Sequence, residues 1–599
     1  PAPNKFKVFM EDPDMVLYAG SASTTQNIAT YVSYNKFVSQ CNLNFNYQTN
    51  GNYRATMIIA GEKNILMQHI NHVGGASLQW GRSYKYQTIR NCIIDGSGVN
   101  SCTVFGLAKY TIMENIWGSN NYAGHGLKIG AYGYIGNCYV SKTGARGADA
   151  TNNGEAILIE PPTNYFSVGS VLSATARSFT YAQYSGNIVT EATRCDAGDI
   201  SVYITDGKGV GQVRRLKYVG QGEYGNYYEF LDGEKDWDVS PDETSLATIV
   251  APSICNTIYA TTVEDTLKPI LLYGNNFDTI VANCTTIDSE GIALCSITVG
   301  SVGRFTANIG IRVENNTIIG TSPVTGYGGI YTQVSRDGGS YCGHEVLNIT
   351  IKNNVLKEIY PDTTLGWAFK PGASEVMDAS GIIVSGAGSA VDIVGSRFIT
   401  VENNTVDGCD GYGIYCSSGV DCLVVRNNKM NNVGTKEEVT LGSPTNTAIM
   451  GHHTLYVNGE VSSLSGEYKM GVLLPETEDY DGMSFLGWTT SPNFQDGDDI
   501  VTLARATETT LYAVYGYKVQ LMLNYEKNGV NAGVGAEYVV QKNAVVQAQV
   551  KAFGEPFRVG YTFGGWYVDA ACTQQADLTT PITQNTKLYA KWTSDETSM

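Results

Sequence analysis

The sequence predicts an all-β protein, most of it a right-handed parallel β-helix solenoid, followed by two small β-rich repeats. Three observations predict this. Only 16% of the 599 residues are charged while Gly (67) and Tyr (39) are abundant, a composition typical of β-rich chains with many turns. A strand–Asn–strand motif recurs through most of the chain, and a different repeat occupies its C-terminal part.

The longer repeat has the length of one β-helix coil. It reads IRNCIIDGSG at 89–98, IMENIWGSN at 112–120, IGNCYVSKTG at 135–144, VANCTTIDSEG at 281–291, VENNTIIGTS at 313–322, IKNNVLKEI at 351–359, VENNTVDGCDGYGIYC at 401–416 and VRNNKMNNVG at 425–434. Asn91 and Asn115 are 24 residues apart, and Asn115 and Asn137 are 22 apart. Strands of successive coils pair at about 4.8 Å, and Asn tolerates the left-handed backbone of the turns.

These motifs resemble the right-handed parallel β-helix repeat proteins of the pectin-lyase-like group, over roughly 50–165 and 255–450. We therefore expect residues 1–165 and 255–450 to be the two parts of one solenoid. Such helices in bacterial secreted proteins often act on glycans, so the resemblance implies a carbohydrate-related function.

Residues 166–254 lack the Asn repeat and predict an inserted β module. Alternating apolar positions around Gly207, Gly209 and Gly211, followed by Trp237, are typical of hairpins. No helix follows the glycines, so this spacing does not predict a phosphate-binding loop.

The C-terminal part carries a second repeat in two copies, expected at 451–516 and 517–599. GMSFLGWTTSPNF precedes TTLYAVYG, and GYTFGGWYVDAACTQ precedes TKLYAKWT, with Trp488 to Tyr512 spanning 24 residues and Trp566 to Tyr589 spanning 23. These motifs resemble the Listeria–Bacteroides repeat, a β-grasp-like module of bacterial surface and secreted proteins. The resemblance implies an extracellular or bacterial cell-surface location.

Charge and cysteine usage exclude several classes of partner and framework. The net charge of −18 argues against a nucleic-acid partner, which needs clustered Lys and Arg. No run of about 18 apolar residues predicts a membrane span. The thirteen cysteines are odd in number, and Asn-Cys at Cys92, Cys138 and Cys284 replaces Asn-Asn, which predicts small buried residues instead of a disulfide framework. The start at Pro1 suggests a processed or truncated product.

Carboxylates within the repeat are expected to serve the turns. Asp95 and Asp407 occupy equivalent places in NCIIDG and NNTVDG, so we interpret both as turn residues. Asp288 lies one residue later in its coil. If its strand continues, Asp288 and Glu290 share a strand face and could bracket a glycosidic bond.

The densest group of charged residues that the repeat does not explain lies at 142–160, KTGARGADATNNGEAILIE. We predict a groove between this loop and the inserted module, because loops on rigid scaffolds form clefts. Carboxylates there could act in glycoside cleavage, whereas a basic side chain could be the base of a lyase. The catalytic candidates are Lys142, Arg146, Asp149, Glu155 and Glu160.

Two further segments supply candidate substrate-binding residues. GHGLKIG, with His125 and Lys128, resembles the Gly-His-Gly motif of polygalacturonase-type glycoside hydrolases. The Asn-Thr-Asp segment and the Asp-Asp pair of that family are absent, so its catalytic aspartates are not carried over. The loop YTQVSRDGGSYCGHEVLN adds Arg336, Asp337 and His344.

Two functions of different classes follow. The first is an enzyme that cleaves a polysaccharide, with glycoside hydrolysis favoured over lyase chemistry because the −18 charge opposes a polyanionic substrate. The second is a non-catalytic surface adhesin or phage tail-fibre protein that binds glycans. We expect a glycan partner, with cell-wall or host-surface association open, and no cofactor, with Ca²⁺ open as a bound ion. The sequence leaves the oligomeric state undetermined.

Overall fold

A computed structural model describes most of the chain in two compact units, residues 1–449 and 450–599. The described residues are 29–31, 37–39, 42–45, 57–60, 63–69, 71–74, 78–80, 85–95, 102–106, 109–119, 125–143, 154–161, 166–190, 199–266, 268–296, 306–321, 328–334, 344–361, 380–386, 395–417, 419–434, 439–441, 444–494, 498–527, 530–531, 533–558 and 560–594. Each unit is considered by itself.

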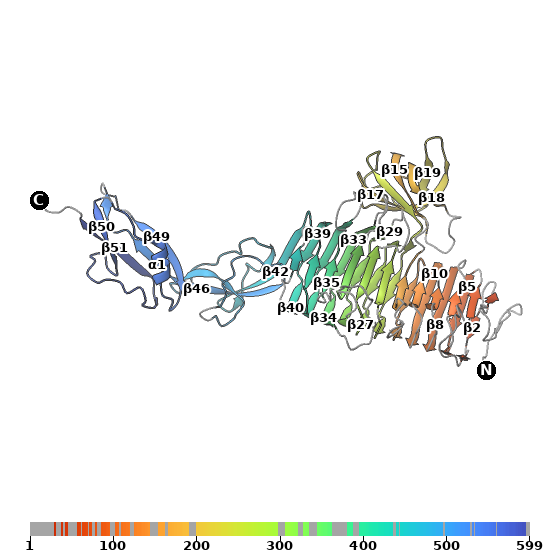
Figure 1. The fold of residues 1–599 in the computed structure, drawn as a ribbon, viewed down its shortest axis with the longest axis horizontal. Coiled ribbons are helices and arrows are strands. Elements are labelled where there is room, and N and C mark those ends of the chain that lie inside the picture. The colour runs from red at the N-terminus through yellow and green to blue at the C-terminus, as the bar shows by residue number, and fades with distance from the viewer. Residues whose placement is uncertain are drawn as a thin grey trace, which may run out of the picture. The chain divides into compact units, whose positions relative to one another are not determined.

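The first unit is a parallel β-helix, which confirms the predicted fold class (Figure 1). One of its faces, sheet A, has twelve strands that are neighbours in chain order. They are β1 (Ala29–Tyr31), β4 (Met57–Ala60), β7 (Leu78–Trp80), β9 (Cys102–Gly106), β11 (His125–Ile129), β14 (Glu155–Ile159), β24 (Lys268–Tyr273), β28 (Ile292–Ser296), β32 (Ile330–Val334), β35 (Ile382–Val384), β38 (Ile414–Cys416) and β41 (Val439–Leu441).

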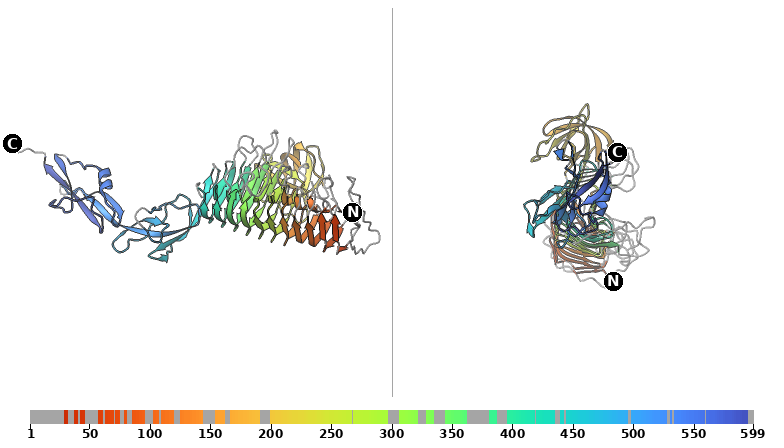
Figure 2. Two further views of the ribbon diagram at one scale, coloured as in Figure 1. Left: turned by 60° about the horizontal axis from the view of Figure 1, so that its bottom comes forward. Right: turned by 90° about the vertical axis from the view of Figure 1, so that its left-hand side faces the viewer.

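The remaining strands of each coil form the other faces, and they also pair in parallel with the next coil. They are β2 (Phe37–Ser39), β3 (Asn42–Phe45), β5 (Lys63–Gln68), β6 (Asn71–Gly74), β8 (Lys85–Asp95), β10 (Lys109–Ser119), β12 (Tyr134–Gly136), β13 (Tyr139–Ser141), β21 (Ser253–Ile254), β22 (Thr257–Tyr259), β23 (Thr262–Glu264), β25 (Asn276–Phe277), β26 (Ile280–Ala282), β27 (Thr285–Ile287), β29 (Thr306–Ile309), β30 (Arg312–Glu314), β31 (Thr317–Thr321), β33 (His344–Lys352), β34 (Val355–Pro361), β36 (Gly395–Glu402), β37 (Thr405–Cys409), β39 (Val420–Arg426) and β40 (Lys429–Val433). Figure 2 shows these strands stacked along the β-helix.

The two residues of each Asn-Asn pair have different structural roles. The first Asn of each pair, such as Asn353 or Asn403, has a φ near +55° and makes the corner of the coil. The second Asn is buried and forms a ladder, in which Asn316, Asn354 and Asn404 each donate from Nδ2 to Oδ1 of the next Asn at 2.9 Å. Cys284 takes the second position in its coil and is also buried, as the Asn-Cys pattern predicts.

Two further corners of each coil also have positive φ, but they carry varied residues. One column contains Tyr86, Tyr110, Tyr132, Cys255, Asp278, Gly310, Asn348, Phe398 and Cys422; another contains Lys142, Asp265, Asp288, Gly320, Glu358, Gly408 and Asn432. We refer to the first of these as the tyrosine corner column. The backbone conformation repeats although the residue type does not.

Residues 166–250 form a closed antiparallel barrel with strand order β15-β16-β19-β18-β17-β20. Its strands are β15 (Phe166–Ala174), β16 (Ser178–Gly186), β17 (Ser201–Asp206), β18 (Val213–Gln221), β19 (Asn226–Phe230) and β20 (Leu246–Val250). The β-helix ladders continue on both sides of it, since β12, β13 and β14 pair with β22, β23 and β24. The barrel has its own core, which includes Phe179, Tyr228 and Trp237.

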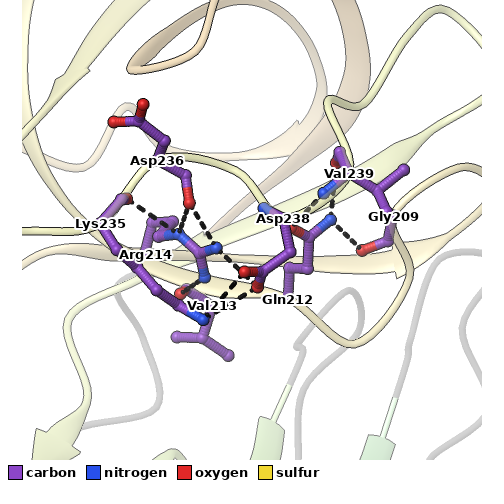
Figure 3. Close-up of polar contacts among 8 residues, drawn as sticks. All are labelled: Gly209, Gln212, Val213, Arg214, Lys235, Asp236, Asp238 and Val239. Carbon is purple, nitrogen blue, oxygen red and sulfur yellow. Dashed lines mark hydrogen bonds and ion pairs between the residues drawn. The ribbon is translucent and has the colours of Figure 1, made fainter.

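Arg214 fastens the 231–240 loop to the barrel (Figure 3). Its guanidinium is 3% exposed, donates to the backbone carbonyls of Val213, Lys235 and Asp236, and pairs with Asp238 Oδ2 at 2.9 Å. Gln212 completes the attachment, because its Oε1 accepts the amides of Asp238 and Val239. Both side chains are therefore structural.

The second unit contains two matching β modules. The first uses β42 (Ala448–Val457), β43 (Glu460–Val461), β44 (Gly466–Lys469), β45 (Ser484–Thr489) and β46 (Thr509–Met522); the second uses β46 with β47 (Glu526–Lys527), β48 (Val530–Asn531), β49 (Val534–Gln541), α1 (Gln547–Phe553), β50 (Tyr561–Tyr567) and β51 (Thr586–Ser594). Trp488 pairs in register with Ala513, and Trp566 pairs with Ala590. Both indoles are buried in the cores of their modules.

Candidate functional site

Three of the predicted site residues lie on sheet A. Lys128 Nζ contacts Glu160 Oε2 at 2.5 Å, and Lys128 is 7% exposed. Glu155 opens β14 and is 3% exposed. In register, Glu155 stands between His125 of β11 and Lys268 of β24. The structure thus brings Lys128, Glu155 and Glu160 to neighbouring strands.

An apolar cluster lies next to Lys128 on sheet A, since Leu158 is the register partner of Lys128. Leu158, Leu271, Ala293, Cys295 and Tyr331 form a buried cluster separate from the other cores. Burial raises the pKa of the Cys295 thiol to about 12, and the charges of Lys268, Glu290 and Glu155 also act on it. These charges therefore lie close to the apolar cluster. Because Glu155 and Glu290 are 3% and 2% exposed, this face offers little accessible carboxylate.

The other predicted residues are more scattered. Lys142 is exposed at a coil corner with a φ of 52°, where its amide donates to the Glu264 carbonyl. His125 and His344 begin β11 and β33, but their side chains lie outside the described residues. Arg146, Asp149, Arg336 and Asp337 also lie outside the residues that the structure describes.

The expected pairing of Asp288 with Glu290 on one strand is wrong. β27 ends at Ile287 and β28 begins at Ile292, so neither residue is in a strand. Asp288 instead makes a coil corner with a φ of 46°. Asp95 ends β8 and Asp407 lies in β37 beside the Gly408 corner, and they accept hydrogen bonds from Ser119 Oγ and Asn432 Nδ2 of the following coil.

A second group of aromatic and charged side chains lies at the junction between the barrel and the tyrosine corner column. Tyr86, Tyr110 and Tyr132 stack with ring centroids 4.9 Å apart at each step. Tyr86 is 50% exposed and Tyr110 37% exposed. Exposed aromatic side chains with polar tips are typical of surfaces that bind partly apolar, partly polar ligands.

Asp199, which precedes β17 of the barrel, meets this column. Tyr132 donates its hydroxyl to Asp199 Oδ2 at 2.6 Å, and Lys109 Nζ donates to Oδ1 at 3.2 Å. Burial alone would raise the pKa of Asp199, but the Tyr132 hydrogen bond and the Lys109 charge outweigh it and lower the pKa below its usual value. Asp199 is therefore ionised over a wide pH range.

Asp278 lies two corners farther along the same column and behaves in the opposite way. The Asp278 side chain is exposed at the surface, but the protein around it displaces part of the water near its carboxyl group. This loss of water raises the pKa of Asp278, and the charge of Glu234 raises it further. Arg215 opposes this effect and is held by Glu234, which accepts from Arg215 Nε at 2.8 Å. The charges of Asp278, Arg215 and Asp199 all act on Cys255, whose thiol pKa burial raises to about 11.

The junction therefore holds two carboxyl groups whose surroundings drive their pKa values apart. This arrangement can bind a polar ligand, and as pH falls Asp278 takes up its proton before Asp199 does. A periodic signal in the sequence points to part of it, since Tyr86, Tyr110 and Tyr132 are spaced by 24 and 22 residues like the Asn corners. Asp199 has no such signal.

The described residues contain no group of three or more His, Cys, Asp or Glu side chains placed to hold a metal ion. Among those residues, no helix has the length and apolarity needed to cross a membrane.

The fold and site together define a parallel β-helix protein with an inserted barrel and appended β modules. Residues 451–514 and 522–591 match the Listeria-Bacteroides repeat domain, as the sequence motifs predict. Two curated proteins of Evansella cellulosilytica, provisionally named a membrane protein and a Gly-rich membrane protein, are 28% and 26% identical over 134 residues. The matched part is 22% of this chain, and it spans only 19% and 15% of those relatives.

Several solved β-helix structures are similar over most of the chain at low scores. A GH87 alpha-1,3-glucanase catalytic domain in complex with tetrasaccharides is 12% identical, with 75% of this chain and 71% of that chain covered and a TM-score of 0.33. A second example is the mannuronan C-5 epimerase AlgE4 A-module of Azotobacter vinelandii, which is 10% identical, with 70% of this chain and 90% of that chain covered and a TM-score of 0.29. A third is the tailspike of E. coli bacteriophage HK620 in complex with a hexasaccharide, which is 10% identical, with 72% of this chain and 59% of that chain covered and a TM-score of 0.29. The architecture given above rests on the strand pairing of this chain itself.

Proposed function

We propose that this protein hydrolyses a glycosidic bond of a polysaccharide at the junction between the barrel and the tyrosine corner column. One observation carries the proposal: Asp199 and Asp278 share this junction, and their pKa values are shifted in opposite directions. A carboxylate that stays ionised suits a base, and a carboxyl that keeps its proton suits an acid. Glycoside hydrolysis needs both.

In the proposed step, Asp278 donates its proton to the glycosidic oxygen as the bond to the anomeric carbon breaks. Asp199 takes a proton from a water molecule, whose oxygen forms the new bond to that carbon. Asp199 is held by Tyr132, and the corners of Tyr132 and Asp278 are two coils, or about 10 Å, apart along the β-helix. Inverting enzymes hold their two carboxyl groups about 6.5–9.5 Å apart, with a water molecule between them, and we propose that arrangement here.

The stacked tyrosines supply binding surface beside this pair. The exposed Tyr86 and Tyr110 continue the column from Tyr132 toward the N-terminus, with one ring per coil. A linear polymer that follows the β-helix axis would meet one tyrosine edge and hydroxyl at each coil. We propose that these rings hold the sugar units on one side of the cleaved bond.

Glycan binding without cleavage is the second candidate function. Lys109 and Tyr132 occupy both oxygens of Asp199, and Arg215 stands 3.9 Å from Oδ2. Such a fully paired carboxylate also suits a site that only binds, as in an adhesin or tail-fibre protein. In either case we propose an extracellular or cell-surface location, which the Listeria-Bacteroides repeats support.

Turnover on a panel of plant, bacterial and host polysaccharides tests the proposal. Reducing ends measure hydrolysis, absorbance near 235 nm detects the unsaturated products of a lyase, and affinity electrophoresis detects binding alone. We expect reducing ends without unsaturated product. Asp199→Asn and Asp278→Asn should each lower the rate by about 10²-fold or more.

Asp407→Asn is the matched control, because Asp407 lies in β37, outside the tyrosine corner column, and should keep the wild-type rate. Equal rates in all three variants would place the chemistry elsewhere, with Glu155 of β14 and Glu290, which precedes β28, as the next residues to replace. Binding without product would establish the second candidate instead.

A further inference from the structure

The barrel is seated on the β-helix through an apolar interface. Tyr203 of β17 packs edge-on against Phe277 of β25, with ring centroids 5.8 Å apart. The same buried cluster joins barrel residues Phe166, Val168, Tyr203 and Val250 to β-helix residues Ala131, Ile254, Phe277, Ala307, Ile309 and Leu347. This interface holds Asp199 against Tyr132, because Asp199 directly precedes β17.

A carboxyl group is buried within this interface. Glu345 of β33 pairs in register with Ala307, is 1% exposed, and has no hydrogen-bond partner at either carboxylate oxygen among the described residues. On the barrel side, burial and then the charge of Glu345 raise the pKa of the fully buried Tyr203, whose register partner on β20 is Thr248. An ionised carboxylate in such surroundings is costly.

Few charges compensate Glu345. Arg397 of β36 lies two residues beyond Gly395, the register partner of Glu345. Its charge favours the ionised form of Glu345, but its Nη1 donates to the Thr205 carbonyl of the barrel at 3.2 Å. Asp206 at the end of β17 disfavours the ionised form. Burial is the largest effect and raises the pKa of Glu345 to about 8.

We propose that Glu345 is a positioning residue that makes the seating of the barrel depend on protonation: the barrel is held tightly while Glu345 carries a proton and loosens when Glu345 ionises. The seating itself is independent of the proposed function. Only its consequence, the displacement of Asp199 from Tyr132 in alkaline solution, rests on that function.

The sign follows from proton binding. An unfolded or undocked Glu345 would titrate near 4.5, whereas the buried group titrates near 8. Between these values the seated state holds more protons than the released state, so seating weakens as pH rises through this range and is weakest above pH 8. Arg397 lowers the pKa of Glu345, so its removal should extend the loosening to higher pH and make the total loss of seating larger.

Hydrogen exchange of the full-length protein, without glycan, tests this at pH 6 and pH 9.5 after correction for intrinsic amide rates. In the wild type, we expect protection of the interface strands β17 and β20 to fall about tenfold or more at pH 9.5. Glu345→Gln should keep the same protection at both values, and Arg397→Gln should show a larger fall in protection between the two values than the wild type. Glu358→Gln, which changes an exposed corner carboxylate, should behave as wild type.

Equal loss of protection in wild type and Glu345→Gln, or no loss in wild type, would overturn the proposal. If Glu345→Gln does not fold, a fall in protection in Arg397→Gln that is no larger than that of the wild type would overturn it. Because no substrate is present, these results stay separate from the test of glycan cleavage.

Discussion

Replacing Asn354 by Ala should open the β-helix locally. Its Nδ2 donates to the Val313 carbonyl and to Asn404 Oδ1, and its Oδ1 accepts from the backbone amide and Nδ2 of Asn316, all at 2.9 Å. The site is fully buried, so the substitution removes four buried hydrogen bonds, although Asn316 Nδ2 still donates to the Val281 carbonyl and Asn404 Oδ1 still accepts the backbone amide of residue 354. At about 1 kcal/mol for each bond, the local opening free energy should fall by about 3–5 kcal/mol.

Native-state hydrogen exchange measures this locally, which matters because a repeat architecture need not unfold in one step. Amides of β30, β33 and β36 should lose protection, while those of β46 should not. Asn353→Gly is the matched control: Asn353 is the neighbouring exposed corner with a φ of 56°, a conformation that Gly adopts without strain. If Asn354→Ala loses no more protection than Asn353→Gly, the ladder does not stabilise the coils as argued.

Three further predictions concern the site and the C-terminal unit. The acidic limb of the pH–rate profile should lie below the usual pKa range of Asp, because the pKa of Asp199 is lowered. The alkaline limb should lie above that range, because the pKa of Asp278 is raised. If the group that must be ionised proves to be Asp278 and the protonated group Asp199, the two roles are exchanged. Trp566→Ala should destabilise the second repeat by about 3–5 kcal/mol in thermal unfolding, since its indole is buried at 6% exposure, and an unchanged transition would contradict that packing. Removal of residues 450–599, which form a separate compact unit, should preserve turnover on soluble polysaccharide, and loss of activity in a folded truncation would show that the repeats take part.

The sequence predicts the solenoid because one of its corners uses the same residue in most coils. Asn at that corner satisfies two requirements at once, a left-handed backbone at the first position and a ladder amide at the second. The tyrosine corner column has the same backbone, yet it uses Tyr, Cys, Asp and Gly in turn, so residue identity carries no repeat there. Its geometry becomes visible only when the strands are in register.

The sequence alone does not predict the proposed site, for a related reason. Asp278 looks like an ordinary loop residue, and Asp199 comes from the inserted barrel. Their proximity depends on how the barrel packs, through contacts such as Tyr203 with Phe277, and no local pattern encodes that docking. The segment 142–160 is dense in charged residues, but Glu155 in it begins β14 and Glu160 pairs with Lys128 of β11. Charge density alone therefore does not distinguish a buried ion pair from a reactive carboxyl.

The most direct test of the proposed function is a crystal structure of the Asp278→Asn variant with an oligosaccharide of the polysaccharide that the protein recognises. The variant should bind without turning over. We predict sugar density along Tyr86, Tyr110 and Tyr132, with a glycosidic oxygen next to Asn at position 278 and a water held by Asp199. Density on the outer face of sheet A beside Glu155, with the tyrosine corner column empty, would contradict the account.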